Sequence, residues 1–380
     1  MTTSGLQLYS LVKENHTLEI SLAEVDVPSP GPDEVIVRVE ATPLNPSDLG
    51  LLFGPADMQT ATVSGPVDRP VIRAEIPAHR MSAAATRLGN PMPVGNEGAG
   101  TVVAAGSSSA AQALMGKTVG VGAGGMYTQF RCVNADRCLV LLQGTTAAQA
   151  ASCFVNPLTA LAMVETMRNE GHTALVHTAA ASNLGQMLNR LCLEEGIGLV
   201  NIVRNVKQES VLRDLGAGHV CNSTTDTFRD DLVSALVATG ATLAFDAVGG
   251  GDLGNQILHG MELAASHGSS TYSHYGSGGN KQLYVYGRLD PSPTILKRNF
   301  GFSWGVGGWL LFQFMAKAGP ERITELNTRI AADITTTFAS HYAKEISLEE
   351  AVSLEAMSEY SRMATGEKFL ITPHSRTVSC

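Results

Sequence analysis

Charged residues are scarce in this chain, at 16% of 380 residues, and acidic residues outnumber basic ones by 35 to 26. The formal net charge of −9 argues against a nucleic-acid partner, so any anion-binding site must be local. The 6 cysteines are scattered without a C-x-x-C pair, so neither a disulfide framework nor a tetrahedral zinc site is indicated. We find no signal-like start and no apolar stretch long enough to span a bilayer. We therefore expect a cytoplasmic protein without a membrane partner.

The length and a hydrophobic fraction of 44% are enough for two ordinary domains with substantial cores. Short strands separated by glycine-rich turns fill the chain up to about residue 146, beginning with the β-branched run Val35–Ala41. This spacing predicts a compact antiparallel, barrel-like domain. Pro43 and Pro46 predict a loop after that run. Residues 56–93 have no clear period, and we expect a surface excursion or a partly ordered flap.

The pattern changes near Ala147 to helical periodicity, with a predicted break at Asn156-Pro157 and a helix from Leu158 to Arg168. Strands and helices then alternate, which indicates βαβ units and a parallel, doubly wound sheet. A final strand, residues 368–371, has no parallel partner nearby in the sequence. We expect it to return to the first domain.

One strand-to-helix turn has the features of a dinucleotide site. The apolar run around Val176 leads into A-x-x-S-x-x-G, from Ala179 to Gly185, and an amphipathic helix follows. Small residues let the backbone approach a pyrophosphate, and a helix N-terminus offers it free N–H groups. The predicted contacts in this turn are Ala179, Ala180, Ser182, Asn183, Leu184 and Gly185. A tightly packed turn without a ligand is the alternative.

The next predicted strand, residues 198–203, ends at Arg204, about 20 residues beyond the turn. An acidic residue there would bind the ribose hydroxyls of NAD, whereas a basic residue suits the additional phosphate of NADP. Arg204, with Lys207 nearby, therefore predicts NADPH. Ligands of doubly wound sheets lie outside the carboxyl ends of the strands, which adds Val248, Gly249, Tyr286 and Gly287 to the predicted cofactor contacts.

Two glycine-rich stretches follow these strands. Residues 301–309 are aromatic, and we interpret them as a mobile segment that either walls the cofactor or mediates subunit contacts. Residues 272–281 are predicted to form an exposed loop, either a surface insertion or a lid.

Five motifs, in order along the chain, resemble the zinc-independent branch of the medium-chain dehydrogenase/reductases, which includes quinone oxidoreductases and enoyl-thioester reductases. The motifs are Asn45-Pro46-Ser47-Asp48, Val94-Gly95-Asn96-Glu97-Gly98, Val155-Asn156-Pro157-Leu158-Thr159-Ala160, the turn Ala179–Gly185 and Gly366-Glu367-Lys368. The resemblance implies a Rossmann sheet inserted into a mostly β, GroES-like catalytic domain. The implied boundaries are 1–155 and 319–380 for the catalytic domain and 156–318 for the NADPH-binding domain. It also implies that Thr159 lies near the nicotinamide and that the protein forms a homodimer. Lys368 either approaches the cofactor or only caps a strand.

Zinc-dependent members of this superfamily have Cys and His ligands near the first two motifs, where this chain has Asn45 and Asn96. We therefore predict no metal and an electron-poor small-molecule acceptor, either a quinone or another alkene conjugated to a carbonyl. Enoyl-thioester reductases have a tyrosine shortly after the first motif, which is missing from residues 51–56. Enoyl-thioester reduction stays open as an alternative, as does an NADPH-binding or sensing protein with little catalysis.

Four further residues are candidates for the site or the core. Asn45 either binds the substrate carbonyl or the cofactor, or shapes its loop; with Thr159 it is a candidate catalytic residue, and no general acid is identified. Glu97 is expected to be structural rather than catalytic. Tyr127 is expected in the core rather than as a proton donor. His177, on a buried strand, is expected to be a hydrogen-bonded core histidine.

Overall fold

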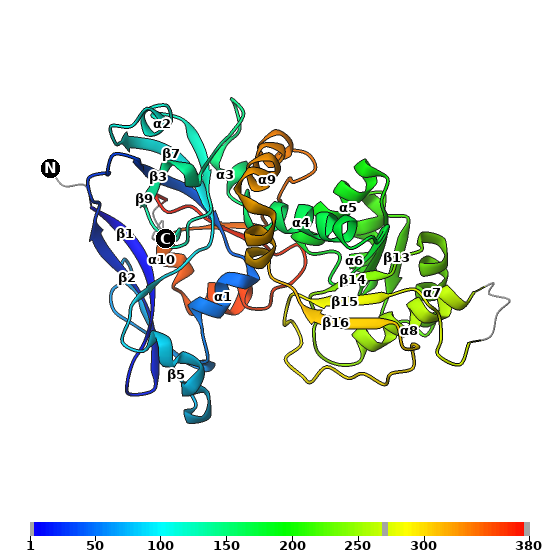
Figure 1. Cartoon of the computed structure of the whole chain (residues 1–380). Coiled ribbons are helices and arrows are strands. Elements are labelled where there is room, and N and C mark those ends of the chain that lie inside the picture. Colours follow the sequence, from blue (N-terminus) through cyan, green and yellow to red (C-terminus); the bar gives the residue numbers. More distant parts are fainter. Residues whose placement is uncertain (1–3, 268–272, 376–380) are drawn as a thin grey trace. The chain divides into compact units, whose positions relative to one another are not determined.

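A computed structural model describes residues 4–267 and 273–375 of the chain. The chain divides into two compact units, the first formed by residues 1–155 and 327–380 and the second by residues 156–326 (Figure 1). The first boundary coincides with the predicted one, and the second lies eight residues beyond the predicted 318/319. Tyr272, at the start of the predicted 272–281 loop, lies outside the described residues.

The first sheet of unit 1 has the strand order β4-β5-β2-β1-β6, and all its pairings are antiparallel. Its strands are β1 (Ser4–Val12), β2 (Thr17–Asp26), β4 (Asp57–Ser64), β5 (Val71–Glu75) and β6 (Met92–Pro93). The expected surface excursion over 56–93 is confirmed in that β4 is mostly exposed, but the segment has regular structure. Half of it is a hairpin, β4–β5, paired onto β2, and the 3-10 helix η1 (Ala78–Arg87) follows. The hairpin was missed because β4 is mostly exposed, so it lacks the alternation of a half-buried strand.

The second sheet of unit 1 has the order β10-β8-β7-β3-β18-β17, with β9 also paired to β3. Its strands are β3 (Glu34–Pro43), β7 (Gly98–Ala105), β8 (Thr118–Val121), β9 (Phe130–Asn134), β10 (Cys138–Val140), β17 (Lys344–Ile346) and β18 (Phe369–Ile371). The return of the last strand is confirmed, because β18 pairs antiparallel with β3. The expectation that it has no parallel partner nearby in sequence was wrong, since β17 pairs with it in parallel.

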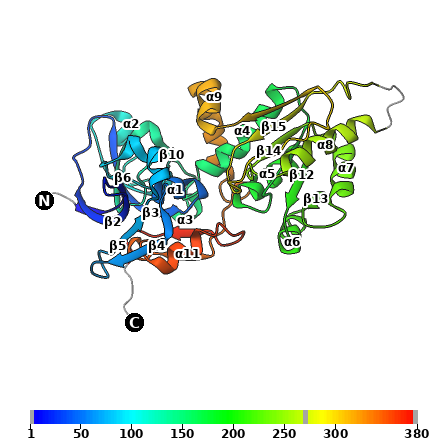
Figure 2. The ribbon, with the colours of Figure 1, turned by 90° about the horizontal axis from the view of Figure 1, so that it is seen from below.

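Short helices complete unit 1: α1 (Pro46–Leu52), α2 (Ser109–Gln112), α3 (Ala147–Ala150), α10 (Leu348–Ala351), α11 (Leu354–Tyr360) and the 3-10 turn η2 (Ala135–Arg137). The loop predicted after β3 is in fact the start of α1. Proline there begins a helix because its missing N–H is one that the first turn would leave unpaired. Helix α11 lies beside β4 (Figure 2).

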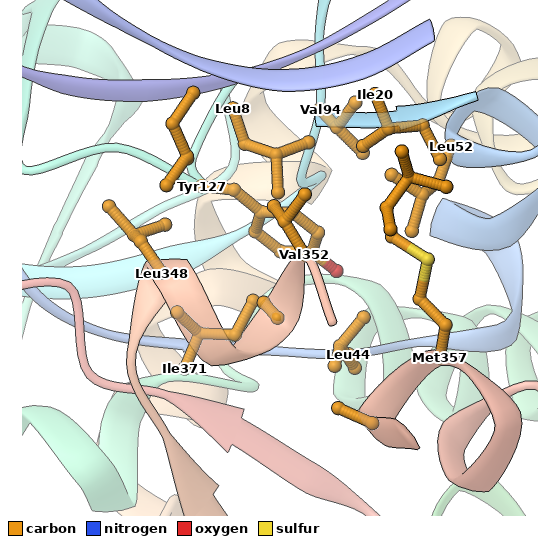
Figure 3. Packing of buried hydrophobic residues seen from close by; sticks show 14 of the residues in the cluster. Leu8, Ile20, Leu44, Leu52, Val94, Tyr127, Leu348, Val352, Met357 and Ile371 are labelled. Carbon is orange, nitrogen blue, oxygen red and sulfur yellow. The ribbon is translucent and has the colours of Figure 1, made fainter. Parts of the chain in front are cut away.

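The core of unit 1 joins both ends of the chain. Figure 3 shows Tyr127 surrounded by Leu8 from β1, Val352 after α10 and Ile371 from β18. Tyr127 is fully buried, which confirms its expected place in the core. Burial of this apolar surface holds the C-terminal segment on the N-terminal strands.

Unit 2 is a parallel sheet in the order β13-β12-β11-β14-β15-β16. Its strands are β11 (Ala174–His177), β12 (Gly198–Val203), β13 (His219–Asn222), β14 (Leu243–Asp246), β15 (Lys281–Val285) and β16 (Trp304–Gly308). The predicted doubly wound sheet is confirmed, and the strand order reverses between β11 and β14. The stretch 301–309, interpreted as a mobile segment, instead supplies β16, which lies beside β15 (Figure 1). Its glycines concealed the strand, because glycine is depleted in strands.

The helices that begin in or belong to unit 2 are α4 (Val155–Asn169), α5 (Asn183–Glu195), α6 (Val206–Asp214), α7 (Phe228–Thr239), α8 (Leu253–Ser266) and α9 (Leu311–Asp333). The two predicted helices are confirmed, with Pro157 in the first turn of the second, where proline is tolerated. The break between them lies at residues 151–154 and not at Asn156-Pro157. Helix α9 consists of two helices joined by a kink at Gly319, which has φ 81° and is followed by Pro320.

Among the described residues, Ala147–Asn169 is long and apolar enough, by length and composition alone, to cross a membrane, contrary to the sequence expectation. In the structure this stretch comprises α3, a turn and all of α4, and 67% of its apolar window is buried within the protein. Core helices pass the same test, so the stretch is weak support for a membrane span.

Candidate functional site

The turn between β11 and α5 is built from small residues that let two backbone segments approach closely. A Cβ atom on Gly185 would lie 2.1 Å from the carbonyl oxygen of Ala180, so only glycine fits there. Ser182 caps α5 and accepts a hydrogen bond from the Gly185 N–H at 3.2 Å. Ala179 has φ 51°, a left-handed conformation that costs a non-glycine residue about 1–2 kcal/mol. The backbone thus has the conformation of a glycine turn even where the sequence has alanine.

The strand order reverses beside this turn, and two polar side chains join the strands there. Thr178, after β11, donates from Oγ1 to Oδ1 of Asp246 at 2.7 Å, and Asp246 ends β14. Asp246 also accepts the N–H groups of Val248 at 2.9 Å and Gly249 at 3.1 Å. In doubly wound sheets, ligands bind outside the strand ends at such a reversal. Sequence analysis missed both residues, although each is a polar residue at the end of a buried strand.

Arg204 follows β12 directly and is exposed, as is Lys207. The Arg204 backbone N–H donates to Oε1 of Gln208 at 3.0 Å. Within residues 4–267 and 273–375, the Arg204 guanidinium takes part in neither an ion pair nor a side-chain hydrogen bond. An exposed cation at the end of the strand next to β11 is therefore available to an anion.

The other predicted contacts lie at the ends of β14 and β15. Gly249 has φ 78°, and its carbonyl accepts a hydrogen bond from Thr294 at 2.6 Å. A Cβ on Gly287 would lie 2.5 Å from the carbonyl oxygen of Ala247, so this glycine is required for the two strand ends to pack. The hydroxyl of Tyr286 lies 2.7 Å from Nε2 of His177.

His177 is buried on β11 as expected, but only one of its ring nitrogens has a partner. Nδ1 of His177 is buried without one in the described structure. Burial lowers the pKa of His177 to about 3, so the ring is neutral at physiological pH. A neutral imidazole accepts at one nitrogen and donates at the other, which suits the hydroxyl of Tyr286 in either tautomer.

Unit 1 contains a second polar cluster, centred on Glu97. Asn45, at the N-terminus of α1, donates from Nδ2 to Oε1 of Glu97 at 2.8 Å. The other carboxylate oxygen accepts the N–H groups of Phe154 at 2.7 Å and Val155 at 2.8 Å. Glu97 is fully buried, and burial raises its pKa although the charge of Lys368 opposes the shift. Glu97 therefore has structural partners at both oxygens.

Asn45 is 3% exposed, and its Oδ1 has no partner among the described residues. A buried acceptor left unpaired costs about 1–3 kcal/mol, so a donor is expected to satisfy it. Because Glu97 holds Nδ2, the amide is oriented with this oxygen unused.

Asp48 is the second buried carboxylate of this cluster. It accepts the N–H groups of Asn45 at 2.8 Å and Asn96 at 2.9 Å, and the hydroxyl of Tyr127 lies 2.9 Å from Oδ2. Burial raises the pKa of Asp48 to about 7 and that of Tyr127 well above its usual value. The Tyr127 hydroxyl also reaches the carbonyl of Pro43 at 3.2 Å. It can therefore donate to Pro43 and accept from Asp48 when that carboxyl is protonated.

Lys368 precedes β18 and donates from Nζ to Oγ of Ser152 at 2.7 Å. Its Nζ lies 5.7 Å from the ring centroid of Tyr342. Burial lowers the pKa of Lys368 to about 8, opposed by the charges of Glu97 and Asp48. The structure thus groups Asn45, Glu97 and Lys368 in unit 1.

The remaining predicted residues belong to unit 2. They are Thr159, which is buried in α4, the turn Ala179–Gly185, Arg204, Val248, Gly249, Tyr286 and Gly287. Across the ranges that the structure describes, no group of three or more His, Cys, Asp or Glu side chains could hold a metal ion. The absence of a catalytic metal stays a prediction.

No protein-family model matches the chain. It is 29% identical over 228 residues to the mitochondrial enoyl-[acyl-carrier-protein] reductase of Xenopus tropicalis, a match that covers 57% of this chain and 57% of the relative. The chain spans about half the length of the curated relatives it matches.

Solved structures match over nearly the whole chain. A Mesorhizobium loti protein assigned as an NADPH:quinone reductase has a TM-score of 0.71 at 24% identity, covering 98% of this chain and 99% of that one. The Etr1p/NADP/crotonyl-CoA complex has a TM-score of 0.69 at 19% identity, covering 97% and 100%. The predicted fold is thus confirmed: the chain has the fold of these solved structures, with a Rossmann sheet inserted into a mostly β, GroES-like domain.

Proposed function

We propose that this protein is an NADPH-dependent oxidoreductase that transfers hydride to a quinone or another alkene conjugated to a carbonyl. The observation that carries the proposal is the pairing of a tight β11–α5 turn with an unpaired arginine, Arg204, at the end of the neighbouring strand. A pyrophosphate suits the turn, and the additional phosphate of NADPH suits the guanidinium. The solved structure with NADP and crotonyl-CoA, which has the same fold, adds support.

The geometry of the turn fits a bound pyrophosphate. The close approach at Gly185 leaves no room for a side chain, and α5 is 13 residues long, so its N-terminus carries a substantial dipole. We assign the pyrophosphate to Ala179, Ala180, Ser182, Asn183, Leu184 and Gly185, and the additional phosphate to Arg204. Val248, Gly249, Tyr286 and Gly287 would line the cofactor at the strand ends, and Thr159 would lie near the nicotinamide. When bound, NADPH supplies a hydride.

The acceptor follows from the side chains at the positions where zinc enzymes have ligands. Asn45 and Asn96 are not the Cys and His side chains that hold zinc, so we expect no metal ion to act as a Lewis acid on the substrate. Hydride transfer without a Lewis acid suits an acceptor that is already electron-poor. Asn45 is the proposed catalytic residue of unit 1. Its unpaired Oδ1 can accept only from an N–H or O–H group, which a quinone or enone carbonyl lacks, so a substrate carbonyl would bind the second hydrogen of Nδ2, whose first is held by Glu97. Thr159 would contribute through its position near the nicotinamide. Orientation of the reactants and exclusion of water would provide most of the rate enhancement.

Enoyl-thioester reduction is the second candidate. It is favoured by the 29% identity to an enoyl-[acyl-carrier-protein] reductase, and the absence of tyrosine from residues 51–56 counts against it. A protein that binds or senses NADPH with little turnover is the candidate from another class.

One set of assays separates these candidates. NADPH affinity is measured by titration of protein fluorescence, and NADPH oxidation is then followed with quinones, enones and enoyl-CoA thioesters. Turnover with quinones or enones supports the proposal, and turnover confined to thioesters selects the second candidate. Binding without turnover selects the sensor. Failure to bind NADPH refutes the proposal.

We also propose a homodimer formed through β16. Among the strands that the structure describes, β16 pairs with β15 alone, and its sequence, Trp304–Gly308, has no charged residue. Phe302, Leu310 and Phe312, on either side of it, are 79%, 55% and 72% exposed. An uncharged edge strand flanked by exposed apolar side chains is suited to pairing with a second copy. Sedimentation of the wild type and of Val306→Lys tests this: we expect a dimer that becomes monomeric, and a wild-type monomer would refute it.

A further inference from the structure

A cavity of about 370 Å³ lies within unit 2, between α7 and α8, which pack side by side (Figure 2). Its polar lining comes from three segments: Arg229 of α7, Asp252, Gln256 and His259 along α8, and Lys297 of the segment 297–299 between β15 and β16. Ligand pockets in proteins have volumes of about 300–1,000 Å³. Because all of these side chains belong to unit 2, the cavity is complete within that unit.

Two hydrogen bonds fix the segment 297–299 along α8. The Lys297 backbone N–H donates to Oδ1 of Asn255 at 2.8 Å, and one helical turn later the Asn299 carbonyl lies 2.7 Å from Nδ1 of His259. Between them Arg298 has φ 56°, a left-handed conformation. Such a backbone persists only where its surroundings hold it, and it is found more often at binding sites. This wall of the cavity is therefore preformed.

The Arg229 guanidinium has hydrogen-bond donors that its neighbours do not use. A backbone carbonyl only accepts, so Nδ1 of His259 carries the hydrogen that faces Asn299, and Nε2 is left as an acceptor. Nε2 lies 3.3 Å from Nη2 of Arg229 and takes one of its N–H groups. Arg229 is exposed, and no carboxylate in the described part of the chain pairs with it. One end of the cavity thus carries an uncompensated positive charge.

The other end of the cavity is polar without an excess of charge. Nζ of Lys297 donates to Oδ2 of Asp252 at 3.0 Å, so the two charges offset each other. Gln256 is exposed on the same face of α8, between this pair and His259. Asp252 and His259 are separated by about two helical turns, or about 10 Å. Donors and acceptors at this end suit the hydroxyl groups of a ligand.

We propose that this cavity binds a small hydroxylated molecule that carries a phosphate group, such as a phosphorylated sugar. The phosphate would accept two parallel hydrogen bonds from the Arg229 guanidinium, the geometry that arginine offers to phosphates. The hydroxyl groups would bond Gln256 and the Asp252–Lys297 pair at the other end. The inference goes beyond the proposed function and does not depend on it, because it uses none of the proposed cofactor contacts.

The test uses glucose 6-phosphate as the probe, and phosphorus NMR follows its titration with the full chain at constant ionic strength. The comparison is between the wild type, Arg229→Gln and the matched control Arg213→Gln. Arg213 is likewise an exposed arginine of unit 2, but it lies on α6 and pairs with Glu209 at 2.9 Å. We expect Arg229→Gln to weaken binding at least about tenfold and Arg213→Gln to leave it unchanged. Arg229→Lys should lie between them, because it keeps the charge and loses the paired donors.

Inorganic phosphate and glucose test the two ends of the cavity separately. Each should bind the wild type at least about tenfold more weakly than glucose 6-phosphate. Equal affinity for inorganic phosphate would overturn the proposal, because the hydroxyl end would then contribute nothing. A wild type that does not bind glucose 6-phosphate, or an unchanged affinity in Arg229→Gln, would overturn it as well. If Arg229→Gln does not fold, Arg229→Lys decides in the same way.

The proposed cofactor site is the other place where a phosphate could bind. Arg204→Ala should leave the affinity for glucose 6-phosphate at the wild-type value, and saturating NADPH should not displace the probe. Displacement by NADPH, or a loss in Arg204→Ala as large as in Arg229→Gln, would assign the phosphate to Arg204 and overturn the inference. A protein that binds glucose 6-phosphate but not NADPH would refute the proposed function and leave this inference standing.

Discussion

The replacement of Arg204 by alanine is the most direct perturbation of the proposed cofactor site. The side chain is exposed, and its guanidinium has no partner within the described residues, so its removal breaks no contact of the fold. Surface substitutions of this kind change stability by about 0.5 kcal/mol or less. Any larger effect on cofactor binding therefore comes from the lost interaction with the ligand.

The expected size of that effect follows from the type of bond. A hydrogen bond to a charged group contributes about 1.5–3 kcal/mol, which corresponds to a loss of roughly 10- to 150-fold in NADPH affinity. NADH lacks the additional phosphate, so its affinity should change by less than about twofold. Preference for NADPH over NADH should thus fall by about the same factor as NADPH affinity.

Fluorescence titration with both cofactors measures this preference directly. Arg80→Ala is a matched control, because Arg80 is likewise exposed and belongs to unit 1. Raising the salt concentration should weaken NADPH binding to the wild type more than to the Arg204 variant, since salt screens an exposed charge pair. Equal losses for NADPH and NADH in Arg204→Ala would remove Arg204 from the phosphate site and refute the reasoning.

Four further predictions concern the turn, the buried carboxyl and the absence of metal. Gly185→Ala should destabilise the protein by about 1–3 kcal/mol in chemical denaturation, because the new Cβ would lie 2.1 Å from the Ala180 carbonyl oxygen. Ala179→Gly should raise stability by about 0.5–1 kcal/mol by relieving a left-handed alanine; a destabilised variant would show that the strain is not real. The folded-state pKa of Asp48, about 7, lies above its ordinary value of 3.8, so the stability that this group provides is complete below about pH 4 and is lost as pH rises through about 7. Denaturation across that range should show a decline in the wild type that is absent in Asp48→Asn. Dialysis against a chelator should leave both turnover and melting temperature unchanged, whereas a loss that zinc restores would contradict the metal-free assignment.

Local sequence patterns predicted the β11–α5 turn and the strand that follows it. Residues 198–203 were predicted as a strand and are β12, and Ala179–Gly185 was predicted as the turn that opens α5. Both are local features, in which a buried apolar run, small residues and a capping serine follow one another. The kinked helix α9 and the edge strand β16 were harder, because glycine and proline hid regular structure that the neighbouring elements stabilise.

The hydrogen-bond partners in the polar cluster of unit 1 could not be predicted from local sequence patterns. Asn45 and Glu97 were both named from motifs, but the sequence left open whether Asn45 faces a ligand or shapes its loop. The structure shows that Glu97 holds its amide nitrogen and that its oxygen is unpaired. Lys368 and Ser152 are 216 residues apart, and Tyr342 and Ser152 are 190 apart, so no local pattern could bring them together.

Local residue patterns predict the alternation of strands and helices, the tight turn and the basic residue after the second strand of unit 2, because these depend on the periodicity and size of neighbouring residues. Which buried polar groups share partners, and which are left unpaired, becomes clear in the folded chain alone. Desolvation and hydrogen bonding act between side chains that meet in space, whatever their separation along the chain.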